Sequence, residues 1–252
     1  MSPDAVTQQE DWALFLDVDG TLLELAETPE SVYVPESLKS LLNALSARLD
    51  GALALVSGRS IADLDGLFSP LRLCASGVHG AERRDASGRL VRPAVDSDRL
   101  REVRDELAAF VASRQGLLLE DKGFALAVHF RLAPEMSVAV HDLVHSLVER
   151  LGPEYVVQAG KCVYEIRPGA WTKGTAIRAL LEQAPFSGRR PLYIGDDVTD
   201  EDAFRVVNSL DGISVRVGDA ATTHAQFRLN RVPDVHRWLG EFPPPAALQR
   251  AV

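Results

Sequence analysis

Two carboxylates, Asp17 and Asp19, follow the short apolar run Leu14 to Leu16 near the start of the chain. The run predicts a buried parallel strand, and Gly20 permits the tight turn with which such a strand ends. Open α/β sheets bind ligands at the carboxyl ends of their strands, so Asp17 is expected at a binding edge. There it could attack a phosphoryl group and form an aspartyl phosphate, with Asp19 as the proton donor. Acidic residues and glycine also end many strands that have no catalytic role.

A second acidic cluster, Asp196 to Asp202, follows another apolar run, Leu192 to Ile194. Carboxylates at adjacent strand ends repel each other unless a cation offsets their charge. Magnesium (Mg²⁺) binds a few such oxygens and keeps waters and substrate oxygens as its other ligands. The pattern therefore predicts a magnesium site in which Asp196 is a direct ligand, with Asp197 and Asp200 behind it.

A helix start could explain part of this acidic cluster without a metal. Thr199 could cap a helix that runs through Ala203 to Val207, and the helix dipole would favour acidic residues in its first turn. This alternative accounts for Asp200 and its neighbours. It does not account for Asp196 and Asp197, which precede the expected cap, so the metal hypothesis is favoured.

Two weaker signals lie between the acidic clusters. A serine hydroxyl and backbone N–H groups in Ser57-Gly58-Arg59, after the apolar run Leu53 to Val56, could hold phosphate oxygens. Lys173, at the start of an apolar-periodic segment, could neutralise phosphate charge. The alternatives are an ordinary strand-end turn followed by a helix cap at Ser60, and a solvated surface lysine.

Strand-like and helical patterns alternate at both ends of the chain and predict a parallel sheet covered by helices. The expected strands are Ala13 to Leu16, Leu53 to Val56, Leu71 to Ala75, Leu192 to Ile194 and Ile213 to Val217, and the expected helices are Glu36 to Leu49 and Gly174 to Gln183. Between them the rhythm changes to αββαββ. We therefore predict an α/β fold, with a Rossmann-like core over residues 1–92 and 168–252 and an inserted α+β cap domain over residues 93–167.

In chain order, these motifs resemble the four motifs of the haloacid dehalogenase-type phosphohydrolases: a nucleophilic Asp, a Ser or Thr, a Lys and a second acidic cluster. Further strings make the chain similar to the trehalose-6-phosphate phosphatase family, over about Trp12 to Val217. They are Gly77 to Glu82, Glu120 to Gly123, Tyr164 to Pro168 and Gly195 to Phe204.

The resemblance implies a Mg²⁺-dependent phosphatase that hydrolyses trehalose 6-phosphate to trehalose and inorganic phosphate, a step of trehalose biosynthesis. It implies that Asp17 is the nucleophile, that Asp19 is the general acid and base, and that Mg²⁺ is held by Asp17, the Asp19 backbone carbonyl and Asp196. Lys173 would act on the phosphoryl group in catalysis. The expected substrate-binding residues outside the cap are Gly20, Thr21, Ser57, Gly58, Arg59 and His79. For His79, a loop histidine with no role stays open as the alternative.

Charged residues of the expected cap share strand faces at i, i+2 spacing. The resemblance assigns Glu120, Lys122 and Glu165 to sugar contacts, and carboxylates and an ammonium suit sugar hydroxyls. From spacing alone, cross-strand ion pairs on a solvated sheet face are the favoured alternative.

Other phosphosugars, such as sucrose 6-phosphate or mannosylglycerate phosphates, and a sugar phosphomutase reaction stay open. A sensor without catalysis is disfavoured, because every expected catalytic position is filled.

Composition argues against nucleic acid and anionic membranes as partners, because the formal net charge is −9. The two cysteines, Cys74 and Cys162, lie in apolar contexts and do not indicate a disulfide framework. The first residues show no basic region followed by an apolar stretch, and no apolar run is long enough to span a bilayer. We expect a cytoplasmic monomer whose partner is a small phosphosugar.

Overall fold

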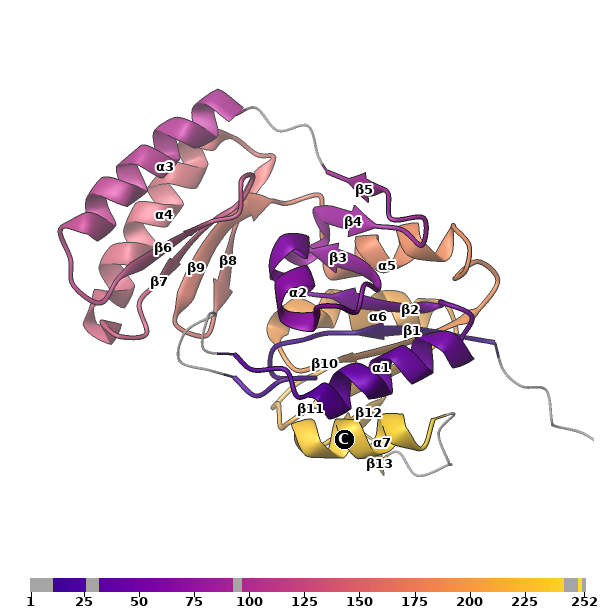
Figure 1. Cartoon of the computed structure of the whole chain (residues 1–252). Coiled ribbons are helices and arrows are strands. Elements are labelled where there is room, and N and C mark those ends of the chain that lie inside the picture. Colours follow the sequence, from indigo (N-terminus) through magenta and orange to yellow (C-terminus); the bar gives the residue numbers. More distant parts are fainter. Residues whose placement is uncertain (1–10, 26–31, 93–96, 243–248, 251–252) are drawn as a thin grey trace, which may run out of the picture. The chain divides into compact units, whose positions relative to one another are not determined.

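Buried apolar strands form the centre of the first of two units in this protein. The computed structural model describes residues 11–25, 32–92, 97–242 and 249–250. The first unit comprises Met1–Leu90 and Lys173–Val252, and the second comprises Val91–Thr172. Within the described residues, the first unit is built on a nine-stranded sheet in the order β13-β12-β11-β10-β1-β2-β3-β4-β5 (Figure 1).

The six central strands of this sheet pair in parallel. Every residue of β1 and β2 is buried, as expected for strands that helices cover on both faces. The strand bounds are β1 Trp12–Leu16, β2 Leu53–Val56, β3 Cys74–Gly77, β4 Glu82–Arg84, β5 Leu90–Val91, β10 Arg190–Gly195, β11 Ile213–Val217, β12 Phe227–Leu229 and β13 Gln249–Arg250.

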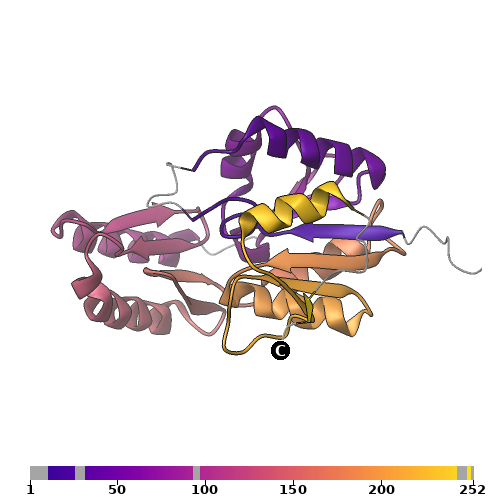
Figure 2. The same ribbon diagram turned by 90° about the horizontal axis from the view of Figure 1, so that it is seen from below.

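Helices pack on both faces of the sheet (Figures 1 and 2). Helix α1 contacts α7 on one face, and α5 contacts α6 on the other. The bounds are α1 Glu36–Arg48, α2 Ile61–Phe68, α5 Lys173–Leu181, α6 Glu201–Ser209 and α7 Val232–Gly240. This arrangement confirms the predicted α/β fold with a parallel-sheet core. The expected cap at Ser60 is also confirmed, because its hydroxyl accepts a 3.1 Å hydrogen bond from the Asp63 N–H at the start of α2.

One local prediction and one alternative were wrong. The strand expected from Leu71 begins only at Cys74, because the Leu71 N–H donates to the Phe68 carbonyl and the preceding residues close the turn after α2. Thr199 does not cap α6. It lies inside a short 3₁₀-helix, η4 (Val198–Asp200), which follows Asp197 and leads directly into α6.

The second unit has the predicted αββαββ order, and within its described residues it holds a four-stranded antiparallel sheet in the order β6-β7-β9-β8. Helix α3 contacts β6, and α4 contacts β8 and β9 and also α3 (Figure 1). The bounds are α3 Ser97–Ala112, β6 Leu118–Asp121, β7 Leu126–His129, α4 Ser137–Leu151, β8 Tyr155–Gly160 and β9 Val163–Pro168. Across the described ranges of both units, no helix is long and apolar enough to cross a membrane.

Candidate active site

The two acidic motifs lie at the carboxyl ends of neighbouring strands. Strands β1 and β10 pair in parallel, with Leu16 opposite Ile194, and the Asp17 N–H donates to the Ile194 carbonyl at 2.9 Å. The Thr21 hydroxyl lies between the two motifs, 3.4 Å from Asp17 Oδ2 and 3.3 Å from Asp196 Oδ1. The sheet topology therefore brings together carboxylates that are far apart in the sequence.

Lys173, the first residue of α5, connects the nucleophile candidate to the second acidic motif. Its Nζ lies 2.7 Å from Asp17 Oδ1 and 2.6 Å from Asp200 Oδ1. Only 3% of Lys173 is exposed, so the alternative of a solvated surface lysine was wrong. Asp200 also accepts hydrogen bonds from the Tyr193 hydroxyl and, at 2.8 Å, from the Asp197 N–H.

Tyr193 also belongs to this cluster, although it lies in the apolar run Leu192 to Ile194 and was not predicted as a site residue. A buried tyrosine usually needs a hydrogen-bond partner for its hydroxyl, and that requirement is the signal that could have pointed to an acidic neighbour.

Burial and mutual repulsion set the charges of the cluster. Burial raises the pKa of Asp17 well above its ordinary value, and nearby Asp200 and Asp196 raise it further, against the opposing effect of Lys173. Burial and Asp200 also raise the pKa of Asp196 to about 6. Burial would lower the pKa of Lys173, but Asp17 and Asp200 outweigh burial and raise it.

The cluster fits a divalent cation. Asp17, Asp196 and Asp200 each offer a carboxylate oxygen, and these oxygens lie within 4.8 Å of one another, against a single lysine ammonium. A hard cation with oxygen ligands offsets such an excess of negative charge. Gly20 keeps this space open: its φ is +81°, and a Cβ there would lie only 2.1 Å from Asp196 Oδ2.

Asp19 has a different partner from Asp17. Arg59 donates from Nε to Asp19 Oδ2 and from Nη2 to Asp19 Oδ1, each at 2.7 Å, so the guanidinium holds both carboxylate oxygens. This two-point geometry is the strongest arrangement of an arginine and a carboxylate. Arg59 was predicted to contact the substrate, and its pair with Asp19 was not predicted.

The turn Ser57-Gly58-Arg59 is held by the loop that contains His79. The Ser57 hydroxyl accepts from the Arg59 N–H at 3.1 Å, and the Ser57 carbonyl accepts from the His79 N–H at 3.0 Å. A Cβ on Gly58 would lie 2.7 Å from the His79 ring, so the imidazole packs on this glycine. His79 thus contacts the turn that was predicted to bind phosphate.

In the second unit, the predicted sugar-binding residues lie together on one sheet face. Lys122 Nζ is 2.8 Å from Glu165 Oε2 and 3.9 Å from Glu120 Oε2, and His129 Nε2 is 2.8 Å from the same Glu120 oxygen. Burial would raise the pKa of Glu120, but the hydrogen bond from His129 and the charge of Lys122 lower it. The cross-strand pairs considered as the alternative are therefore present.

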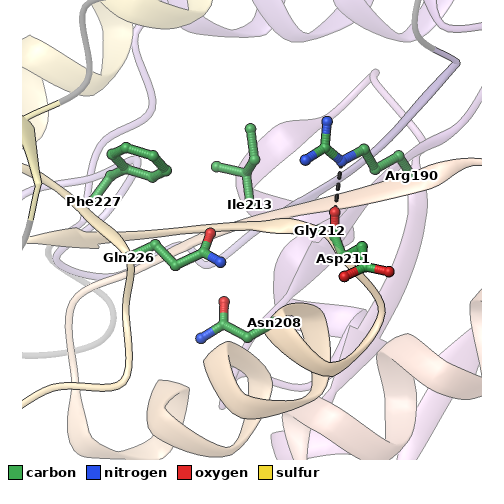
Figure 3. Close-up of a pocket in the computed structure, with 7 residues that line it drawn as sticks. All are labelled: Arg190, Asn208, Asp211, Gly212, Ile213, Gln226 and Phe227. Carbon is green, nitrogen blue, oxygen red and sulfur yellow. Dashed lines mark hydrogen bonds between the residues drawn. The ribbon is translucent and has the colours of Figure 1, made fainter.

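A pocket of about 540 Å³ lies at the opposite, amino ends of β10, β11 and β12 (Figure 3). It contains none of the predicted site residues. Arg190 Nε donates to the Asp211 carbonyl at its rim, at 2.6 Å. Its lining residues are Arg190, Asn208, Asp211, Gly212, Ile213, Gln226 and Phe227. The candidate catalytic groups therefore lie at the other ends of the strands, the carboxyl ends.

Comparison with known proteins gives consistent results. The family model for trehalose-phosphatase matches residues 15–233. A probable trehalose-phosphate phosphatase of Sinorhizobium fredii (strain NBRC 101917 / NGR234) is 51% identical over 212 residues, which cover 84% of this chain and 80% of the relative. The trehalose-6-phosphate phosphatase of Escherichia coli (strain K12) is 44% identical over 228 residues, which cover 90% of this chain and 85% of the relative.

A solved structure shares the fold as well. It is described as a trehalose-6-phosphate phosphatase related protein, has a TM-score of 0.75 and 30% sequence identity, and the match covers 90% of this chain and 94% of that chain. The family match includes the end of β1, all of β10 and the acidic motifs that follow these strands. This chain therefore belongs to the trehalose-phosphatase family.

Proposed function

We propose that this protein is a phosphatase that hydrolyses trehalose 6-phosphate to trehalose and inorganic phosphate. The observation that carries the proposal is the buried contact of Lys173 with Asp17, beside Asp196, at two adjacent strand ends. In a chain of the trehalose-phosphatase family, this arrangement supports phosphoryl transfer to an aspartate.

Asp17 acts as the nucleophile through Oδ2. Lys173 holds Oδ1 at 2.7 Å, whereas the Thr21 hydroxyl is 3.4 Å from Oδ2, so Oδ2 is the oxygen better placed to attack phosphorus. The bond between phosphorus and the sugar oxygen breaks, and Asp19 gives a proton to that oxygen. Asp19 then takes a proton from the water that hydrolyses the aspartyl phosphate and regenerates Asp17.

Arg59 competes with this proton transfer. Its guanidinium occupies one lone pair on each carboxylate oxygen of Asp19, which leaves fewer positions from which Asp19 can pass a proton to the sugar oxygen. Substrate phosphate is a competing two-point acceptor for Arg59. Arg59 thus releases Asp19 when it turns to the substrate. The observed contact with Asp19 and the predicted contact with substrate then belong to two successive stages of the reaction.

The remaining charged groups stabilise the phosphoryl group. Asp17, the Asp19 carbonyl and Asp196 would hold Mg²⁺, which would offset phosphate charge when bound. Lys173 also neutralises phosphate charge, and Asp200 Oδ1 fixes its Nζ at 2.6 Å. Backbone N–H groups at Gly20 and Thr21 and the Ser57 hydroxyl complete the phosphate-binding set.

We assign catalysis to the first unit and sugar recognition to the second, where Glu120, Lys122 and Glu165 bind the sugar hydroxyls. Their charged groups are already within contact distance of one another, which supports a preorganised polar surface. The protein is expected to act as a monomer in the cytoplasm, which size-exclusion chromatography with light scattering and cell fractionation would check.

Phosphate release from a panel of phosphosugars in the presence of Mg²⁺ tests the function. Trehalose 6-phosphate should be hydrolysed fastest, and the Asp17→Asn variant should release phosphate only at the background rate, because no amide can replace the nucleophile. Faster turnover of sucrose 6-phosphate or a mannosylglycerate phosphate would contradict the proposal that trehalose 6-phosphate is the substrate. A requirement for a sugar bisphosphate would indicate a phosphomutase instead.

A further inference from the structure

Helix α6, which follows the second acidic motif directly, carries polar residues along one face at positions 201, 205 and 208. This i, i+4, i+7 spacing places Glu201, Arg205 and Asn208 in one row. All three contact His224, a residue of the connection from β11 to β12: Glu201 accepts from its backbone N–H at 2.7 Å, and Asn208 Nδ2 donates to its carbonyl at 2.7 Å. Arg205 Nε lies 3.3 Å from its ring Nε2.

Glu201 is the centre of this row. Its carboxylate also accepts from the Thr223 hydroxyl at 2.8 Å, from Arg216 at 3.0 Å, and contacts His224 Nδ1 at 3.0 Å. The Glu201 side chain is only 14% exposed. Burial would raise the pKa of Glu201, but hydrogen bonds from His224 and Thr223 and the charge of Arg216 lower it. Glu201 is therefore a charged and well-bonded side chain at the start of α6.

Arg216 connects this centre to the acidic motif. Successive side chains of β11 point to opposite faces of the sheet, so Ser214 and Arg216 share one face. On this face, toward α6, the Ser214 hydroxyl donates to Asn208 Oδ1 at 2.6 Å. Arg216 Nη1 bonds Glu201 and also lies 3.4 Å from the Asp197 carbonyl. The Asp197 N–H in turn donates to Asp200 at 2.8 Å. Both backbone polar groups of Asp197 thus have defined partners.

The backbone of Asp197 matters because Asp196 precedes it. The Asp196 carboxylate is 3.3 Å from the Thr21 hydroxyl, and its position depends on the backbone that leaves β10. Groups behind a metal ligand commonly orient it, and losing one of them weakens metal affinity. Arg216 and Glu201 hold this backbone from the side away from β1.

We propose that Arg216 and Glu201 are positioning residues that orient Asp196 for a divalent cation through the Asp197 carbonyl. This inference rests on the proposed magnesium-dependent function. The two residues touch neither phosphate nor sugar in it. Their loss therefore weakens cation binding before any effect on the chemistry of a cation-saturated enzyme.

Isothermal titration of the full-length protein with Mg²⁺, without substrate, tests the proposal. Glu201→Gln keeps the shape of the side chain but removes its charge. Arg216→Lys keeps the charge but lacks the guanidinium whose Nη1 reaches both Glu201 and the Asp197 carbonyl. Both variants should bind Mg²⁺ about 10- to 100-fold more weakly than the parent. Arg205→Ala is the matched control, because Arg205 contacts His224 on the same helix face but not Asp197, and its affinity should stay within about twofold.

Thermal unfolding separates positioning from a general structural role. If both test variants lose thermal stability yet bind Mg²⁺ as the parent does, the inference is overturned. Asp196→Asn is titrated in parallel. It distinguishes failure of this inference from failure of the proposed function. If the parent binds no Mg²⁺, or Asp196→Asn binds as tightly as the parent, the proposed cation site is wrong and the inference falls with it. If the parent binds and Asp196→Asn does not, unchanged affinity in Glu201→Gln and Arg216→Lys overturns the inference alone.

Discussion

Asp17 and Asp19 stand two residues apart, yet their carboxylates have different surroundings. Asp17 is buried and bonded to Lys173, whereas the Asp19 side chain is 31% exposed and bonded to Arg59. A buried carboxylate against a fixed ammonium suits a nucleophile of constant position. A more exposed carboxylate with one displaceable partner suits a group that must exchange protons with a leaving sugar and then with water.

Replacing Asp19 separates these two roles. Asp19→Asn should slow hydrolysis of trehalose 6-phosphate by roughly 10²- to 10⁴-fold through loss of proton transfer, and should leave Mg²⁺ affinity nearly unchanged because the backbone carbonyl remains. An aryl phosphate with an acidic phenol should suffer less, since its leaving group needs no proton. Steady-state rates on both substrates check this. Equal slowing on both would show that Asp19 is not the general acid.

At the scale of the elements, the turn after β1 limits what residue 20 can be. Gly20→Ala should lower phosphatase activity by about 10²-fold, because its Cβ would displace the Asp196 carboxylate and small misplacements of catalytic groups are costly. Gly88→Ala is a matched control: Gly88 also has a positive φ, +84°, but a Cβ there would meet nothing within 4 Å. It should cost about 1–2 kcal/mol in the free energy of unfolding through backbone strain, and leave activity intact.

The result for these two glycines can contradict the steric argument. If Gly20→Ala keeps parental activity and Mg²⁺ affinity, the acidic cluster tolerates a side chain at this turn. If Gly88→Ala loses activity as well, positive φ alone explains the effect.

The sheet of the second unit supports a similar comparison across its two faces. Glu120→Ala, Lys122→Ala and Glu165→Ala should each impair trehalose 6-phosphate hydrolysis by about 1.5–3 kcal/mol of transition-state stabilisation, and should barely change aryl phosphate turnover. Asp121→Ala is the control. Asp121 ends β6 and lies between Glu120 and Lys122 in the sequence, but its side chain pairs with Arg104 of α3 on the other face of the sheet. Loss on both substrates would assign the three residues to folding, and loss on neither would leave them as ordinary cross-strand pairs.

Much of this arrangement could be predicted from local patterns, because β1 and β2 are buried apolar runs with clear ends. Contacts between distant segments could not. The Arg59 pair with Asp19 depends on β1 lying beside β2, and no feature of the turn itself indicates that partner. The Thr199 cap failed for a local reason, because Asp197 and Asp200 use their own hydrogen bonds to begin the helical segment earlier.

At the scale of the whole molecule, the acidic cluster links stability to pH and to Mg²⁺. The pKa of Asp196 in the folded protein is about 6, above the ordinary 3.8, so its contribution to stability is fully present below about pH 4 and is lost as the pH rises through 6. Mg²⁺ needs the ionised carboxylate and offsets this loss. The increase in Tm caused by Mg²⁺ should therefore be larger at about pH 7.5 than at about pH 5.

Thermal unfolding with and without Mg²⁺ at the two pH values measures this effect. Asp196→Asn should lose the Mg²⁺-dependent increase at both. An equal increase in Tm at both pH values in the parent would mean that Asp196 does not exchange a proton for the metal.

The pairing of β1 with β10 also has a consequence for biosynthesis. The ribosome makes Asp17 before its partners, because Lys173, Asp196 and Asp200 follow only after the whole of Val91–Thr172. The second unit has its own sheet and helices, so the nascent chain can form it from consecutive residues while β1 still lacks its neighbour. Any chain whose synthesis stops before β10 carries the nucleophile without its lysine-bound acidic partner. Phosphatase activity therefore arises only after β10 and Asp200 have been synthesised, and products that terminate before β10 are inactive.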